Sequence, residues 1–448
     1  MDDKYGSIEE RISGLFTTEA RLQTWLDVEA ALAQCQAQLG IIPEDAAVQI
    51  AAAAKIENID MDEYQLRYKK TKHPLVPLLD LLKQAAGPAG EYVHLGATTH
   101  DVVDIAKMVM MKQVWDITEQ VLLDIEGELV RLMEAHSGTL MAGRTHNIQA
   151  LPITFGFKAA VWASEIGRDI QRLRESRERI FAVTFSGASG TMSSFDGKGA
   201  QLEAMLANHF GLSVPDLCWH AARDRVAELA GILAIIGGTL GRIAQEVYLL
   251  MGTETGELSE GYTEGLVGSS AMPHKINPIN SQHIMGDSRT LRYDAAHCLE
   301  CMRIDHEHNL VHFDDERTTL EHMGVTMADL LHRSWEMIST LYVNKERMRR
   351  NLDLLKGAVE SEAVMLALGK KIGKMTAKGI VTELAVQAVR QDTPLAQLLK
   401  EDQRVSGHLT PEEIDQLLDP APYGKDAAAI ALSYAAKVRA HRKAEGLD

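Results

Sequence analysis

Residues 268–278 are Gly268-Ser269-Ser270-Ala271-Met272-Pro273-His274-Lys275-Ile276-Asn277-Pro278. The segment combines two serines, a lysine and two prolines, and it has little apolar surface to bury. Asn277 is a favourable N-cap and Pro278 suits the first helical position, so we expect a helix to begin there. The free N–H groups of that helix and the charge of Lys275 would favour an anion, either a carboxylate or a phosphate.

A glycine-rich run from Gly252 to Gly265 precedes this stretch and gives its serines room to move. A mobile serine above an anion pocket suggests proton abstraction next to a carboxylate. Because serine is a weak base, its alkoxide would need stabilisation by neighbouring N–H groups and by Lys275. A Gly-Ser turn followed by a helix cap is the alternative interpretation.

The stretch resembles the signature of the fumarase/aspartase superfamily, and its Met-Pro-His-Lys form is similar to that of the adenylosuccinate lyase and 3-carboxy-cis,cis-muconate cycloisomerase branch. The resemblance covers nearly the whole chain. It implies an all-α fold in three segments: an N-terminal helical domain (1–104), a central bundle with the signature loop (105–343) and a C-terminal helical domain (344–448). It also implies a homotetramer built around the central bundles, with active sites shared between subunits.

Composition limits the partners of the protein. Lys plus Arg is 46 against 63 for Asp plus Glu, a formal charge of -17, which argues against nucleic acid. The acidic N-terminus is unlike a secretory signal, and the longest apolar stretch, 229–241, is shorter than the roughly 20 residues of a membrane span. We therefore expect a cytoplasmic protein without a membrane partner.

Two cysteines lie close in sequence to four histidines, which raises the question of a metal site: Cys298, Cys301, His297, His306, His308 and His312. There is no second Cys-x-x-Cys pair, and the histidines do not follow finger spacing. We expect buried helix thiols and pocket histidines, with no metal and no cofactor.

Local patterns support an all-α chain, because no strand-like alternation of any length occurs and aromatic residues are only 5%. A helix is expected from Thr17 to Leu39, with Thr17 or Thr18 as its cap and Gly40 after its end. Glu29 interrupts the apolar face of this helix, and we expect it to be paired at the edge of a core. Later positions alternate spacings of four and three and require partner helices: Leu229, Leu233, Ile236, Leu240, Ile243, Val247 and Leu250.

Two segments place polar residues at bends or helix starts. His73 lies on a break before Pro74, where it is either a site histidine or a solvated loop histidine. Thr98, Thr99 and His100 precede a helix expected over 102–123, with Asp101 as its cap, and they could donate hydrogen bonds to a carboxylate. The same place in the superfamily binds a substrate carboxylate, and adenylosuccinate lyases have an active-site histidine at a position comparable to that of His73.

A third block, 143–152, carries Thr145 and His146 before a long helix expected to end near Phe181. Imidazole titrates near neutrality without help, so His146 is the natural proton carrier. Superfamily members have a histidine here that protonates the leaving group or binds the substrate, whereas many bacterial carboxymuconate cycloisomerases have tryptophan. His146 therefore favours an elimination enzyme.

The chain departs from adenylosuccinate lyases where those enzymes bind their nucleotide. Arg317 matches an arginine that they use at the substrate, but Asp314 and Asp315 stand where they have serines. Ala222 replaces a glutamine, and Lys4-Tyr5 only partly matches an Arg-Tyr pair. Two carboxylates would repel a phosphate, so we expect a non-nucleotide substrate with a leaving group that is smaller or positively charged.

The expected reaction is anti β-elimination from a small dicarboxylate, an N-substituted aspartate, with release of fumarate. Ser269 is the base because the superfamily base is the first serine of the pair, and Ser270 is expected at the substrate. Lys275, Asn277 and the helix-end N–H groups would stabilise the aci-carboxylate. The alternatives are a 3-carboxy-cis,cis-muconate cycloisomerase and a structural protein built on an inactive lyase.

Overall fold

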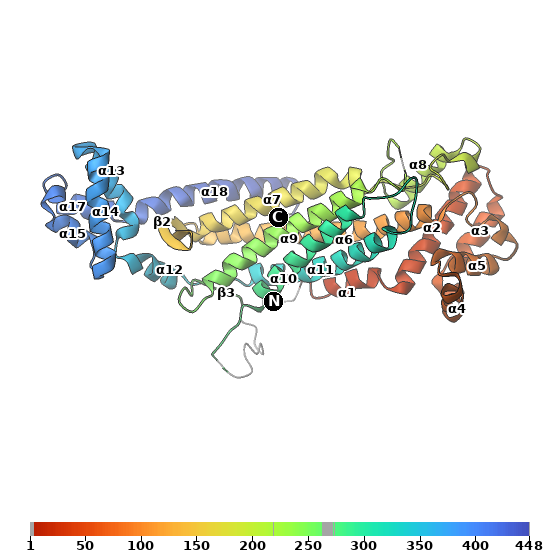
Figure 1. The fold of residues 1–448 in the computed structure, drawn as a ribbon, viewed down its shortest axis with the longest axis horizontal. Coiled ribbons are helices and arrows are strands. Elements are labelled where there is room, and N and C mark those ends of the chain that lie inside the picture. Colours follow the sequence, from red (N-terminus) through yellow and green to blue (C-terminus); the bar gives the residue numbers. More distant parts are fainter. Residues whose placement is uncertain (1–3, 218, 262–271, 273, 448) are drawn as a thin grey trace. The chain divides into compact units, whose positions relative to one another are not determined.

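The computed structural model describes residues 4–217, 219–261, 272 and 274–447. Most of them are helical, which confirms the all-α class (Figure 1). The helices are α1 (Ile8–Leu15), α2 (Thr18–Gln38), α3 (Glu44–Ala53), α4 (Met61–Thr71), α5 (Leu75–Ala85), α6 (Thr99–Ala135), α7 (Phe155–Ile180), α8 (Gly199–Phe210), α9 (Asp224–Leu250), α10 (Ile279–Glu300), α11 (Phe313–Ser339), α12 (Lys345–Leu352), α13 (Ser361–Ile372), α14 (Lys374–Gln391), α15 (Leu395–Glu401), α16 (Gln403–Ser406), α17 (Pro411–Leu417) and α18 (Ala421–Ala444). The short strands are β1 (Leu140–Thr145), β2 (Ile148–Thr154), β3 (Leu258–Ser259) and β4 (Tyr342–Val343).

The chain divides into two compact units. Unit 1 consists of Met1–Leu122, Arg168–Gly241 and His283–Arg333, and unit 2 consists of Leu123–Gly167, Arg242–Gln282 and Ser334–Asp448. The boundaries fall inside long helices, so these units differ from the three segments expected from the sequence. The three-segment division stays a prediction.

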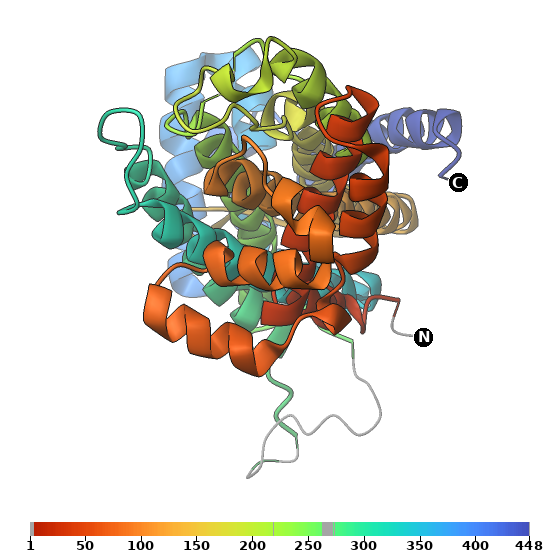
Figure 2. The ribbon, with the colours of Figure 1, turned by 90° about the vertical axis from the view of Figure 1, so that its right-hand side faces the viewer.

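The N-terminal helices of unit 1 follow the local signals of the sequence (Figure 2). Thr17 caps α2 by accepting a hydrogen bond from the Ala20 N–H at 3.2 Å, and α2 packs against α3 and α8. Lys72 adopts a left-handed conformation, with φ of 55°, between α4 and α5. The expected break before Pro74 is therefore confirmed.

Helix α9 has the apolar seam that its spacing predicts, because all seven seam residues from Leu229 to Leu250 are buried. By length and composition this helix could also cross a membrane, but most of its apolar window is buried inside the structure. Burial of this kind is typical of a core helix in a soluble protein.

Unit 2 contains a β-hairpin that the sequence analysis did not expect. Strands β1 and β2 are antiparallel, pair Thr145 with Ile148, and contact α12 and α18. The register shifts at Gly143, where a Cβ would lie 2.8 Å from the Leu151 carbonyl oxygen, so only glycine fits this bulge. The block around His146 is therefore a hairpin turn rather than a simple helix start.

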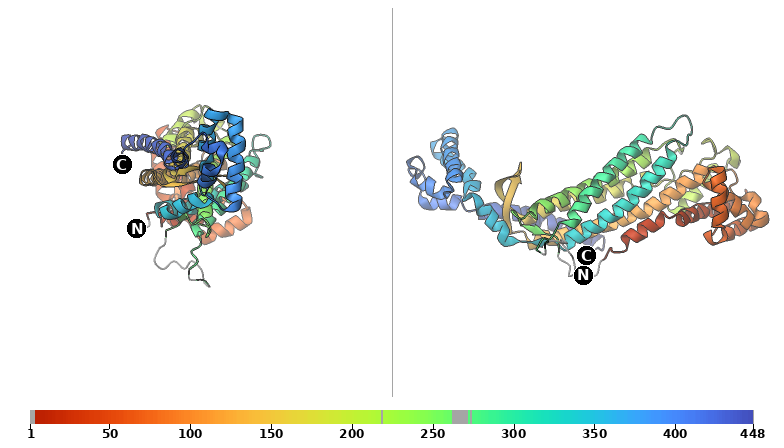
Figure 3. Two further views of the ribbon diagram at one scale, coloured as in Figure 1. Left: turned by 90° about the vertical axis from the view of Figure 1, so that its left-hand side faces the viewer. Right: turned by 60° about the horizontal axis from the view of Figure 1, so that its bottom comes forward.

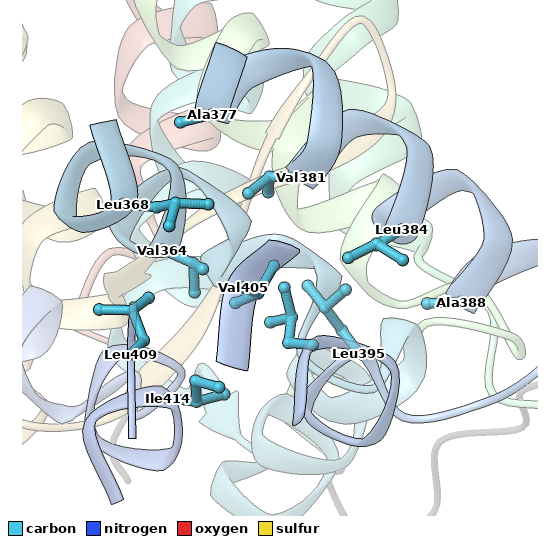
Figure 4. Packing of buried hydrophobic residues seen from close by; sticks show 11 residues of the cluster. Val364, Leu368, Ala377, Val381, Leu384, Ala388, Leu395, Val405, Leu409 and Ile414 are labelled. Carbon is cyan, nitrogen blue, oxygen red and sulfur yellow. The ribbon is translucent and has the colours of Figure 1, made fainter. Parts of the chain in front are cut away.

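The C-terminal helices of unit 2, drawn in blue in Figure 3, have an apolar cluster of their own. Side chains from α13, α14, α15 and α17 converge in it, as Figure 4 shows. Leu368 in α13 is fully buried in this cluster, whereas Leu366 in the same helix is 51% exposed.

Replacing Leu368 by alanine should lower the free energy of unfolding by about 3 kcal/mol, because the lost methyl groups leave a cavity in the cluster. Leu366→Ala is the matched control and should change it by less than about 1 kcal/mol. Urea unfolding followed by circular dichroism measures both. Equal effects of the two substitutions would contradict the packing of α13.

Candidate active site

The expected site residues fall in both units. His73, Thr98, Thr99, His100 and Arg317 belong to unit 1. Thr145, His146, Lys275 and Asn277 belong to unit 2. Ser269 and Ser270 lie outside the described residues. We therefore describe the site groups of each unit separately.

Unit 1 brings His73 to the turn at the start of α6. The His73 Nε2 lies 3.5 Å from the Thr99 Oγ1. The Val76 N–H donates to the His73 Nδ1 at 3.2 Å, so the proton of the neutral ring is on Nε2. Burial, and then the nearby His94, lower the pKa of His73. His73 is thus a neutral hydrogen-bond donor, suited to hold a carboxylate rather than to accept a proton.

His94 lies near His73 and was not among the expected site residues. Its Nδ1 is 2.6 Å from Oε1 of Glu29, which is only 2% exposed. The expectation that Glu29 is paired is therefore confirmed. Two features of the sequence indicate this pair: a carboxylate interrupts the apolar face of α2, and a histidine opens the threonine segment.

His100 is packed more tightly than a simple substrate ligand would be. It is 6% exposed, and its ring centroid lies 4.0 Å from that of Phe313 and 4.5 Å from that of His308. Burial lowers the pKa of His100 to about 3. His100 is therefore neutral at physiological pH.

We expected Asp101 to be the N-cap of α6, but α6 begins at Thr99, so Asp101 lies inside the helix. Its buried carboxylate instead accepts hydrogen bonds from the N–H groups of Thr98 at 2.9 Å, Ser186 at 2.8 Å and Gly187 at 3.1 Å. The threonine turn and the small-residue loop that begins at Ser186 are therefore held side by side by one side chain. The cap prediction was wrong because the sequence does not identify partners 85 residues away.

Four charged side chains form a buried network close to this turn. Asp104 binds Lys107 at 2.6 Å and the Arg223 Nη1 at 2.7 Å. Glu316 binds Lys107 at 2.5 Å and the Arg223 Nε at 2.8 Å. Although burial alone would raise it, the pKa of Asp104 is held well below its usual value by Arg223 and Lys107.

His220 extends the network by bridging two carboxylates. Its Nε2 lies 3.1 Å from Asp101 and its Nδ1 lies 3.4 Å from Asp104. Although burial alone would lower it, the pKa of His220 is raised by these two carboxylates. A protonated His220 donates from both nitrogens.

Arg317 makes its ion pairs within unit 1. Its guanidinium binds Glu321 at 2.9 Å and lies 3.6 Å from Asp314, and Glu321 also binds Arg21 at 3.2 Å. No hydrogen bond or ion pair joins Arg317 to Thr98, Thr99 or His100 among the described residues. Arg317 is therefore already paired with carboxylates of its own helix.

In unit 2, His146 lies at the tip of the hairpin. His146 and Asn147 both have positive φ, 52° and 63°, as the two-residue turns of tight hairpins require. Asparagine accepts this conformation readily, whereas histidine does so at a cost of about 1 kcal/mol. The strand end next to this turn is fixed by Arg144, which binds the buried Glu257 at 2.6 and 2.9 Å.

The start of α10 differs from the sequence prediction. The helix begins at Ile279, one residue later than expected, and Pro278 accepts the Gln282 N–H through its carbonyl at 3.1 Å. The N–H groups of Asn280 and Ser281 donate to the carboxylate of Glu260. The expectation that free helix-end N–H groups bind the substrate anion is therefore wrong for this turn. Lys275 is exposed and forms no ion pair with another described residue.

Within the described part of the chain, no group of three or more His, Cys, Asp or Glu side chains is arranged to hold a metal ion. Cys298 and Cys301 are free thiols and are buried, as expected. Burial raises the pKa of Cys298 to about 12 and that of Cys301 to about 11. Both thiols are therefore protonated at neutral pH.

Comparison with known proteins identifies the family of the chain. The Lyase family matches residues 3–291, and the adenylosuccinate lyase C-terminus family matches residues 357–432. N-acetyl-S-(2-succino)cysteine lyase of Dickeya dadantii is 39% identical over 94% of this chain and 93% of its own length. A 3-carboxy-cis,cis-muconate cycloisomerase of Pseudomonas aeruginosa is 37% identical over 91% of this chain and 90% of its own length. A fumarate lyase from Mesorhizobium sp. BNC1, known from its crystal structure, has a TM-score of 0.89 and is 34% identical, with 95% of this chain and 97% of that one covered.

The chain is thus a lyase with an all-α fold, and it belongs to the fumarase/aspartase superfamily. Its C-terminal part places it in the branch that contains adenylosuccinate lyases and carboxymuconate cycloisomerases.

Replacing His146 by glycine should remove activity without loss of stability, because glycine accepts positive φ and only the imidazole is lost. We expect kcat to fall by about 100-fold or more and the melting temperature to stay equal or rise. Asn147→Gly, at the other turn position, is the matched control and should keep near wild-type kcat. Full activity in His146→Gly would contradict a chemical role for this histidine.

Acid should destabilise the protein through His100. Because its folded pKa is lowered, the unfolded chain binds a proton that the folded chain does not, so stability falls as pH drops below about 6.5. This one group contributes a slope of up to about 1.4 kcal/mol per pH unit. Urea unfolding between pH 6.5 and 5 should show a smaller slope for His100→Gln than for wild type, and equal slopes would contradict a neutral buried His100.

Proposed function

We propose that this lyase releases fumarate by anti β-elimination from a small succinyl substrate. Ser269 removes the proton next to a substrate carboxylate, and Lys275 and Asn277 stabilise the resulting aci-carboxylate. His146 protonates or positions the leaving group. Thr98, Thr99 and His73 hold the second carboxylate, and the neutral Nε2–H of His73 supports this donor role.

We further propose that the leaving group is a thiol, so that the substrate is a thioether such as N-acetyl-S-(2-succino)cysteine. The Dickeya relative has this activity in its name. A cysteine thiol has a pKa near 8.5, so a thiolate is a better leaving group than an amine, and His146 supplies its proton as it departs. An N-substituted aspartate, which would make the enzyme a C–N lyase, is the other substrate of the same reaction class.

The pairing of Arg317 with carboxylates of its own helix is the observation that supports a small substrate without phosphate. Its guanidinium is paired with Glu321 and lies near Asp314, and Asp314 and Asp315 occupy the first turn of α11. Carboxylates already occupy the place where a helix start and an arginine could bind phosphate. Arg317 would then act on substrate only through the helices it joins, and Thr145 would contact substrate beside His146.

A second candidate function is the cycloisomerisation of 3-carboxymuconate, which the 37% identical relative from Pseudomonas aeruginosa favours. His146 weighs against it, because an imidazole at this position serves an elimination. The presence of Lys275, Asn277 and His146 weighs against a structural protein without activity.

We propose a cytoplasmic homotetramer whose active sites are shared between subunits. Large apolar side chains exposed on the central helices support an assembly: Ile235 and Leu249 on α9, and Tyr293 and Leu299 on α10. These side chains are 47%, 50%, 71% and 58% exposed, respectively. Sedimentation that gave a monomer would contradict shared sites.

Purified enzyme should form fumarate from N-acetyl-S-(2-succino)cysteine, with the fumarate absorbance and the free thiol rising in equal amounts. Adenylosuccinate should give at least about 100-fold lower kcat/KM, because a phosphate meets no unpaired arginine at Arg317. Ser269→Ala is the inactive control.

Each other outcome selects a different function. Fumarate from adenylosuccinate at comparable kcat/KM would contradict the phosphate argument. Fumarate from N-substituted aspartates alone would replace the thiol by an amine. A lactone from 3-carboxymuconate without any fumarate would establish the cycloisomerase instead.

A further inference from the structure

The first turn of α10 is closed by a carboxylate of the chain itself. Glu260 Oε2 accepts the Asn280 N–H at 3.0 Å, and Glu260 Oε1 accepts the Ser281 N–H at 2.7 Å and the Ser281 hydroxyl at 2.5 Å. Glu260 is 7% exposed and Ser281 is fully buried. A carboxylate at a helix N-terminus is stabilised by charge-assisted hydrogen bonds and by the helix dipole.

All four N–H groups from residue 279 to 282 have partners. The Ile279 N–H donates to the Asn277 carbonyl at 2.9 Å and the Gln282 N–H donates to the Pro278 carbonyl at 3.1 Å. Glu260 accepts the two between them. This helix end therefore has no N–H group left for a substrate anion.

Glu260 is itself held on a fixed backbone. It directly follows β3, in which Leu258 pairs with Val343 and Ser259 pairs with Tyr342. The Glu260 N–H also donates to the Met251 Sδ at 3.4 Å. The start of α10 is thus tied to the β3–β4 ladder through a single side chain.

We propose that Glu260 is a positioning residue for the reaction, whose carboxylate fixes the backbone that presents Asn277 and Lys275. Asn277 precedes Asn280 by only three residues, and its carbonyl is already bonded to Ile279. The restricted φ of Pro278 limits the freedom of the chain between them. This inference rests on the proposed function, in which Asn277 and Lys275 stabilise the aci-carboxylate.

The same contact keeps Lys275 available. The negative charge of Glu260 is satisfied by backbone N–H groups and a hydroxyl, and no ion pair links it to Lys275. The helix dipole and the lysine therefore serve different anions: the helix end binds an internal carboxylate, and the exposed lysine remains for the substrate carboxylate. Removing Glu260 would change both arrangements at once.

Two substitutions test this role with a matched control. Glu260→Gln keeps the shape but turns an amide N–H₂ group towards a helix N–H, and Glu260→Ala leaves space at the helix end. Glu246→Gln, which removes a charge from a partly exposed pair with Lys158 in the same unit, is the control. The readouts are kcat, KM and the melting temperature of each purified variant, with whichever substrate the wild type converts.

Both Glu260 variants should lose about 100-fold in kcat, the expected effect of shifting a catalytic group by about 1 Å. KM should change by less than about threefold, because the stabilised charge develops in the transition state. The control should keep wild-type kcat. Formate should restore kcat of Glu260→Ala in a saturable manner, since its two oxygens can accept the Asn280 and Ser281 N–H groups, and it should not stimulate wild type.

A wild-type kcat in the folded Glu260→Gln variant would overturn the proposal. A loss of activity that is fully explained by a smaller amount of folded protein would overturn it as well. If Glu260→Ala does not fold, the kcat of Glu260→Gln decides alone. Wild-type enzyme that converts none of the offered succinyl substrates would instead contradict the proposed function. Glu260 would then be tested by protection of the Asn280 and Ser281 amides from hydrogen exchange, which Glu260→Gln should reduce.

Discussion

Buried charges that balance one another hold the described site residues of unit 1 in place. Asp101, Asp104 and Glu316 supply three carboxylates, Lys107 and Arg223 oppose them, and His220 lies between Asp101 and Asp104 with its pKa raised by both. Each of these groups would cost several kcal/mol if it were buried alone, so removal of one leaves another uncompensated. The network joins α6, the segment before α9, and α11. His220 links this network to Asp101, which accepts the Thr98 N–H group. The geometry of the turn with Thr98 and Thr99 therefore depends on the network.

Internal carboxylates also explain which groups are left for the substrate. Asp101 takes backbone N–H groups beside the threonine turn, and Glu260 takes those at the start of α10. A helix end is an attractive anion site, but here the chain fills one with its own glutamate. In the proposed mechanism, the substrate carboxylates are therefore bound by side chains: the threonine hydroxyls, His73 and Lys275. Side chains can change rotamer as negative charge develops on the aci-carboxylate, so the backbone need not move.

Features determined by neighbouring residues could be predicted from the sequence. The cap of α2 at Thr17, the break at Lys72 and the buried seam of α9 all depend on local spacing. The hairpin at His146 was missed because a two-residue turn with short strands gives too little alternation to detect. It was also hidden by the strong helical pattern that follows it.

The contacts that position the site could not be predicted, because they join residues far apart in sequence. Glu29 and His94 are 65 residues apart, and Glu260 and Asn280 are 20 apart. A sequence identifies such groups as candidates but does not say which of them meet. The expectation of a free helix end at Asn277 was wrong for this reason, although Lys275 remains exposed as the proposed catalysis requires.

Stereochemistry tests the central claim of anti elimination most directly. The enzyme would be incubated with fumarate and N-acetylcysteine in D₂O, and the thioether product examined by proton NMR against a sample without enzyme. Anti addition predicts one deuterium on the succinyl carbon adjacent to the sulfur-bearing carbon. The product should be a single diastereomer with one vicinal coupling constant between the two succinyl protons. A mixture of diastereomers no different from the uncatalysed sample, or a single product of syn addition, would contradict the account.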